Sequence, residues 1–254
     1  MPQDRIPIEA GPGSFAACAG DFGQDGLPDV FIAGDARNRL YHNRAGGGWN
    51  YEEVLQWSGE VEYISRGGGI AVQAADVTGD GLQDLFIAYG TRMAPHILFN
   101  LGSRCFQHAR ELDLSEQRGA IEKTDANLVD HAGQGQQAGY LGDFNGDGAL
   151  DMALVLGNGD VCVFPRKVSP DSPAKGIAVS LSPGAERAGP VAVTVAAERR
   201  SLGCWTVPAG GGPVLIGARQ AGPVQLQWRW PGGEIQTRRV KVKESVVPVD
   251  LGRP

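Results

Sequence analysis

The stretch Asp143–Asp151, DFNGDGALD, has an oxygen-bearing side chain at its first, third and fifth positions, then a glycine, and ends on another aspartate. Carboxylates this close repel one another unless a positive charge lies between them. The stretch belongs to a motif that occurs three times. Residues 21–32 read DFGQDGLPDVFI, residues 76–87 read DVTGDGLQDLFI and residues 143–154 read DFNGDGALDMAL. Each copy has Asp at positions 1, 5 and 9 and Gly at position 6.

This pattern favours calcium, which takes roughly six to eight oxygen ligands and needs a glycine where the loop turns sharply. Side chains at positions 1, 3, 5 and 9 and the backbone carbonyl of position 7 can supply these oxygens. The predicted ligands are Asp21, Asp25, Leu27 and Asp29 in the first loop, Asp76, Thr78, Asp80, Leu82 and Asp84 in the second, and Asp143, Asn145, Asp147, Ala149 and Asp151 in the third.

Other interpretations of the loops fit less well. An EF-hand needs a glutamate at position 12, where these loops have Ile32, Ile87 and Leu154. Magnesium prefers a smaller octahedral shell with several waters. An Asp-Gly hairpin turn with exposed carboxylates accounts for a single copy but not for three matching ones. Because position 3 is Asn145, Thr78 and Gly23 in turn, we expect the third site to bind calcium most tightly and the first least.

The repeat extends beyond the loops, which start 55 and 67 residues apart at positions 21, 76 and 143. Short strand-like runs flank each loop, and units one and two each have four of them. Such a four-stranded unit is typical of a β-propeller blade. The third unit lacks a clear fourth run. After Lys175, valines alternate with polar residues, as in a small antiparallel β domain. The predicted fold is therefore all-β: about three blades of a partial or partner-completed β-propeller (1–168), then an antiparallel β domain (169–254).

The units resemble FG-GAP repeats, also called VCBS repeats, which form integrin-α-like propellers. The resemblance rests on the D-F-x-x-D-G-x-x-D pattern followed by LYHN (40–43) or LFN (98–100), and it covers about residues 14–168. It implies a calcium-stapled propeller whose loops bind protein or carbohydrate. The piece VQLQWRWPGGEIQT (224–237) resembles the ASPIC/UnbV domain, which commonly follows FG-GAP repeats. The family resemblance favours an extracellular or periplasmic location, although the N-terminus has no signal-peptide pattern.

The bulk composition excludes several classes. The net charge is −6 with no basic run, which argues against a nucleic-acid partner. No apolar run approaches the roughly 20 residues of a membrane span. The cysteines Cys18, Cys105, Cys162 and Cys204 fit no zinc spacing. We expect buried thiols, with a disulfide between two of them left open.

No catalytic motif is recognisable, and His42 and His96 occupy comparable structural positions in units one and two. The predicted function is a calcium-stabilised, non-catalytic binding or scaffold module. The alternative is an enzyme or biosynthesis accessory protein with a site at the propeller mouth. Of Trp228 and Trp230, we expect one in the core and one half exposed, or else an aromatic binding platform.

Propellers typically close with about four to eight blades. Three blades do not close a ring, and the open ends can be covered in three ways: by further blades of a longer chain, by a partner or second copy, or by the C-terminal domain as a cap. We expect a subunit of a larger particle, in contact with a different protein through the first or third blade. We also expect residues 115–136 to form a polar surface loop.

Overall fold

The computed structural model describes residues 13–34, 38–44, 49–52, 69–90, 95–102, 106–111, 136–168, 174–185, 189–198, 200–210, 212–230 and 232–252. These residues form strands joined by turns and bends, which confirms the all-β fold class. The strands form five small sheets, none of which closes on itself. No helix in this part of the chain is long and apolar enough to cross a membrane. The predicted loop 115–136 lies almost entirely outside the described residues.

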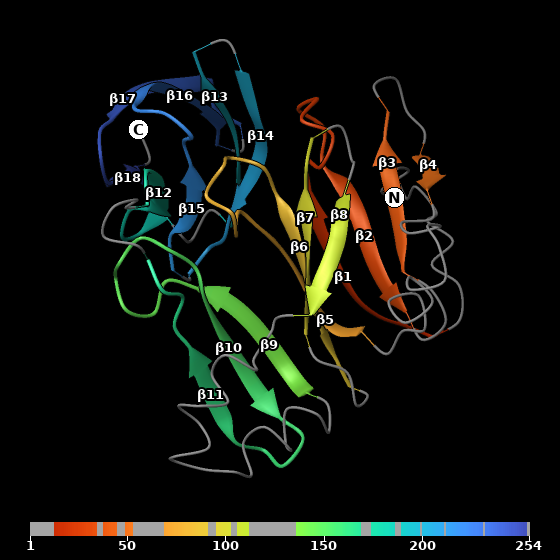
Figure 1. Ribbon diagram of the computed structural model, residues 1–254. Coiled ribbons are helices and arrows are strands. Elements are labelled where there is room, and N and C mark those ends of the chain that lie inside the picture. Colours follow the sequence, from red (N-terminus) through yellow and green to blue (C-terminus); the bar gives the residue numbers. More distant parts are fainter. Residues whose placement is uncertain are drawn as a thin grey trace.

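Three of the sheets are the predicted blades (Figure 1). In blade one the strand order is β1 (Ser14–Gly20), β2 (Asp29–Gly34), β3 (Arg39–Asn43) and β4 (Trp49–Glu52). Blade two orders β5 (Gly69–Ala75), β6 (Asp84–Tyr89), β7 (His96–Asn100) and β8 (Phe106–Glu111). Blade three has β9 (Gln136–Gly142), β10 (Asp151–Leu156) and β11 (Val161–Phe164). All neighbouring strands within the blades are antiparallel, as the alternating runs and short turns require.

The blades pack face to face through their first strands. β5 lies against β1 and β2 of blade one, and β9 lies against β5 and β6 of blade two. One apolar cluster between blades one and two contains Phe31, Leu40 and Leu98, and another between blades two and three contains Phe86 and Leu154. Small residues permit the close approach: a Cβ on Gly139 would lie 2.9 Å from both Ala88 Cβ and the Phe86 ring.

The C-terminal part is a two-sheet sandwich with its own core. The strand order of one sheet is β15 (Val214–Gly217), β12 (Gly176–Leu181) and β18 (Val246–Leu251). The other orders β14 (Arg200–Val207), β13 (Val191–Ala197), β16 (Gly222–Arg229) and β17 (Ile235–Val242). One pair departs from the antiparallel prediction, because β12 and β18 run parallel.

The expectation for the two tryptophans was wrong in one respect. Both Trp228 and Trp230 are buried in the core of the sandwich, so neither forms a half-exposed surface. The Trp230 indole donates to the carbonyl of Gly252 at 3.1 Å. Cys18, Cys162 and Cys204 are free thiols of intermediate burial. Burial raises the pKa of the Cys18 thiol to about 12, so it stays protonated.

Candidate functional site

The three aspartate loops share one backbone shape. The glycine at position 6 has a positive φ in each loop: 86° at Gly26, 84° at Gly81 and 83° at Gly148. Glycine adopts this conformation without steric cost, which is why the sharp turn can occur there. The motif therefore specifies the same turn at the same end of each blade.

The first aspartate of each loop binds the backbone of its own turn. Asp143 accepts N–H groups from Gly146 at 2.7 Å, Asp147 at 3.1 Å and Gly148 at 2.9 Å. Asp76 does the same with positions 4, 5 and 6 of loop two. These bonds hold the carboxylate inside the turn. Asp143 keeps acceptor capacity for a cation, whereas the oxygens of Asp76 also accept the N–H of Gly217 and so already have four donors.

The ninth aspartate has backbone partners too. The two oxygens of Asp151 accept N–H groups from Phe144 at 3.0 Å and Arg166 at 2.8 Å. The two oxygens of Asp84 likewise accept the N–H groups of Val77, at position 2 of its loop, and Asn100. This aspartate therefore ties the loop to the end of the third strand of its blade in blade two, and to the second residue beyond that strand in blade three. Its role as a calcium ligand stays a prediction.

Loop three brings its predicted donors together at positions 1, 3 and 5. The amide nitrogen of Asp147 lies 3.1 Å from Asp143 Oδ1 and 2.9 Å from Asn145 Oδ1, so both oxygens converge on one point. The Asn145 side-chain nitrogen donates to Asp147 Oδ2 at 3.0 Å. Over the described part of the chain, no three acidic, histidine or cysteine side chains converge as a ready metal cluster. An ion in loop three would therefore also need the Asn145 amide oxygen and the Ala149 carbonyl, as the sequence predicts.

Loop two is the most buried of the three loops, and two of its carboxylates have clearly raised pKa values. Burial raises the pKa of Asp76 to about 6, and it raises the pKa of Asp84 to about 7, where the Asp76 and Asp80 carboxylates add to the effect. Ionised carboxylates crowded in a dry environment favour a neutralising cation. The Asp80 carboxylate already pairs with Arg219, while Thr78 is exposed at the surface.

Loop one departs from the other two. Gly23 supplies no side chain at position 3, and Gln24 has a φ of 60° where loops two and three have Gly79 and Gly146. The ninth residue, Asp29, accepts from His42 Nδ1 at 2.7 Å and from the N–H of Asn43 at 2.9 Å. Its other oxygen is buried with no hydrogen-bond partner in the described structure, which a cation could satisfy. This oxygen is the feature of loop one that fits a cation, and calcium binding by the three loops stays a prediction.

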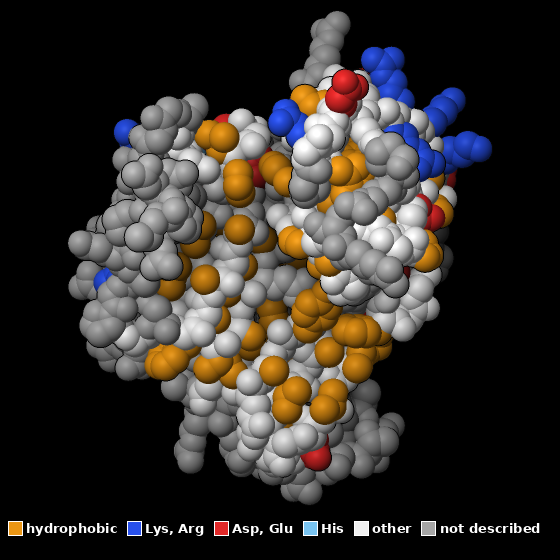
Figure 2. Space-filling model, turned by 180° about the vertical axis from the view of Figure 1, so that it is seen from behind, with side chains coloured by type: hydrophobic (Ala, Val, Ile, Leu, Met, Phe, Trp, Pro, Cys, Tyr) orange, Lys and Arg blue, Asp and Glu red, His pale blue; other side chains and the backbone are white. Residues whose placement is uncertain are grey.

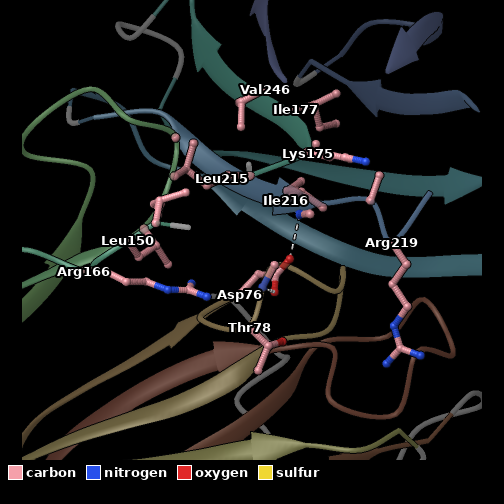
Figure 3. A pocket seen from close by; sticks show the side chains of 18 of the residues that line it. Asp76, Thr78, Leu150, Arg166, Lys175, Ile177, Leu215, Ile216, Arg219 and Val246 are labelled. Atoms are coloured by element: carbon pink, nitrogen blue, oxygen red, sulfur yellow. Dashed lines mark hydrogen bonds between the residues drawn. The ribbon is translucent and has the colours of Figure 1, made fainter. Parts of the chain in front are cut away.

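The sequence left capping by the C-terminal domain as one of three possibilities and did not show where that domain would bind; in the structure it contacts loops one and two. The N–H of Cys204 donates to Asp21 at 2.9 Å, and the N–H of Gly217 donates to Asp76 at 2.6 Å (Figure 3). The Gln83 side chain donates to the Cys204 carbonyl at 2.8 Å. Through these bonds the sandwich caps the loop ends of blades one and two. No periodic sequence signal marks Cys204 or Gly217 for this contact.

A cavity of about 410 Å³ lies between loops two and three and the sandwich (Figure 3). Asp76, Thr78 and Leu150 line its blade side, and Ile216 and Val246 line its sandwich side. Two of its basic residues form ion pairs, Lys175 with Glu244 and Arg219 with Asp80. Arg166 donates to the carbonyl of Val77. Arg219 therefore joins the sandwich to loop two, and Arg166 joins blade three to loop two.

Comparison with known proteins supports the repeat. Residues 21–87 match the FG-GAP-like repeat family. This FG-GAP-like repeat begins at the first aspartate of loop one and ends in β6, so it spans loops one and two. No curated protein matches the chain.

Among solved structures, one similar chain is an Agrocybe aegerita lectin, described for its specific recognition of non-reducing terminal N-acetylglucosamine. The similarity covers 58% of this chain and 37% of the lectin, with 19% identity and a TM-score of 0.37. This chain therefore matches little more than a third of the lectin's length, and a likeness at this level says nothing about its ligand.

Proposed function

We propose that the chain is a calcium-stabilised, non-catalytic module that binds a protein, or alternatively a carbohydrate, within a larger assembly. The observation that supports it best is in loop three, where Asp143 Oδ1 and Asn145 Oδ1 both accept the N–H of Asp147 and so lie close together. The FG-GAP-like repeat at residues 21–87 agrees with a binding module. The ASPIC/UnbV identity of residues 169–254 is part of the same proposal and rests on the sequence around Trp230.

Calcium stabilises the fold in this proposal because the folded loops gather oxygen ligands that the unfolded chain does not. At a free calcium concentration about 100 times the Kd, the gain is about 2.7 kcal/mol per site. For a chain of this size that corresponds to a rise in Tm on the order of 5–10 °C.

Thermal unfolding in calcium and in a chelator tests the proposal. We expect a clearly higher Tm in calcium and a smaller rise in magnesium, whose octahedral shell these loops fit poorly. Equal midpoints in calcium and chelator would remove calcium from the proposed function.

A further inference from the structure

Blade three has an apolar sheet face that no other described part of the chain covers. The register places Tyr140, Ala153 and Val163 in one cross-strand row and Ala138, Val155 and Val161 in the next. Tyr140 is 52% exposed, Val161 69% and Val163 50%. Apolar side chains are exposed on the lower part of the molecule, where blade three lies (Figure 2). A contiguous apolar face of this kind usually marks an interface.

The equivalent residues of the other two blades are buried by the next blade. Phe31 and Leu40 of blade one are covered by blade two, and Phe86 and Ile97 of blade two are covered by blade three. The residue at position 2 of the loop is likewise buried in blade one and exposed in blade three. Phe22 is fully buried and packs edge-to-face on Phe106 at 5.7 Å, whereas its counterpart Phe144 is 51% exposed. Blade three is thus built to receive another blade.

Blade one has the matching free surface. Each blade docks on the preceding one through its first strand, β5 on β1 and β9 on β5. The first strand of blade one, β1, has no preceding blade among the described residues. Phe15, Ala17 and Ala19 are exposed along it, and Phe15 is 57% exposed. Ala17 and Ala19 correspond in the repeat to Gly139 and Leu141, which pack against blade two.

From these two surfaces we propose that the partner of blade three is blade one of a second copy of this chain. With β1 of each copy on β9 and β10 of the other, two copies form a two-fold ring of six blades. Closed propellers have about four to eight blades, so this ring is of normal size. The described part of the C-terminal sandwich leaves this face of blade three free, because Tyr140, Val161 and Val163 are exposed while the sandwich binds loops one and two.

The repeat also indicates which residues meet. Between blades two and three, the Gln73 side chain donates to the Leu141 carbonyl at 3.0 Å and accepts from the Leu141 N–H at 2.8 Å. Tyr140 has the position of Gln73, and Ala19 has the position of Leu141. The Tyr140 ring of one copy therefore lies against Ala19 of the other. The inference names a partner for the proposed assembly and rests on that part of the proposed function, but it is independent of calcium.

Light scattering coupled to size exclusion tests the ring in excess calcium. We expect wild-type protein at about twice the 26.8 kDa of one chain. Tyr140→Lys and Ala19→Glu each place a charge in both interfaces, and each should weaken dimerisation at least tenfold. Mixing the two variants should restore the dimer, since one interface then pairs Lys with Glu and the other is wild type. Ile235→Lys, at an exposed residue of β17, is the matched control and should remain dimeric.

Each other result counts against the ring. A monomeric wild-type chain, an open polymer or a dimer unaffected by both variants would overturn the proposal. So would a mixture that stays monomeric while each variant keeps a wild-type melting profile. Because a misfolded variant cannot be rescued by mixing, restoration also separates loss of contact from loss of fold. Absence of calcium stabilisation in the thermal test would affect the proposed function but not this result.

Discussion

The contact of Gly217 with loop two is the point at which a single added methyl group should separate the sandwich from the blades. A Cβ on Gly217 would lie 2.1 Å from the carbonyl carbon and oxygen of Gly79, and 2.6 Å from its Cα. All three are backbone atoms, so no side chain can rotate away. Gly217→Ala therefore forces β15 away from loop two and stretches the 2.6 Å bond from its N–H to Asp76.

The cost has two parts. Overpacking a tight contact costs roughly 1–3 kcal/mol. Loss of a hydrogen bond to a charged, buried carboxylate costs roughly 1.5–3 kcal/mol. We expect Gly217→Ala to lower the free energy of unfolding by about 3–5 kcal/mol, and Tm by on the order of 10 °C.

Denaturant unfolding measures this change, with Gly212→Ala as the control. Gly212 precedes the same strand, and an added Cβ there meets nothing within 4 Å. Its substitution should alter stability by less than about 0.5 kcal/mol. If the two variants are equally stable, Gly217 does not approach Gly79 as described, and the capping of the loops by the sandwich is wrong.

Two further predictions each compare a pair of substitutions. In loops three and one, Oδ1 of the position-5 aspartate accepts the N–H of position 7 at 2.9 Å, so Asp147→Ala and Asp25→Ala should cost about the same in chelator, roughly 1 kcal/mol. In calcium, Asp147→Ala should lower the free energy of unfolding clearly more than Asp25→Ala does, because loop three also has Asn145 as a ligand. If chemical denaturation gives the reverse order, the residue at position 3 does not determine which site binds calcium more tightly. Gln24→Gly should stabilise the protein by about 0.5–1 kcal/mol, because Gln24 has a φ of 60° that glycine adopts freely. The control Gln137→Gly, in strand β9, should destabilise the protein by a similar amount. If Gln24→Gly destabilises the protein, the positive φ of Gln24 does not strain the backbone.

The sequence predicted the blades well because their signals are local. The runs around Phe31, Phe86 and Met152 alternate or are continuously apolar, and Asp-Gly turns separate them, so each strand is specified by its own residues. The sequence of unit three has no clear fourth run, and the described part of blade three has the strands β9, β10 and β11. The same holds for the turn at position 6, where a glycine with positive φ is required.

Contacts between distant segments could not be predicted in this way. β12 and β18 pair in parallel although Gly176 and Val246 are 70 residues apart, and alternation identifies a strand without naming its neighbour. The burial of both Trp228 and Trp230 likewise depends on how two sheets face each other. The hydrogen bond from Gly217 to Asp76 depends on small residues whose importance appears only when the chain has folded.

The conserved geometry of the loops within this chain gives the second one a role that reaches beyond its own turn. Asp76 shares Oδ2 between Gly81 of the loop and Gly217 of the sandwich. Asp84 joins Val77 of the loop to Asn100, and the Asn100 side chain donates to the Phe22 carbonyl of blade one at 3.1 Å. Two carboxylates therefore connect the loop to the sandwich and to the neighbouring blade. A change in charge balance within loop two acts on all of these contacts together, because a carboxylate that loses its negative charge becomes a weaker acceptor for every amide that it holds.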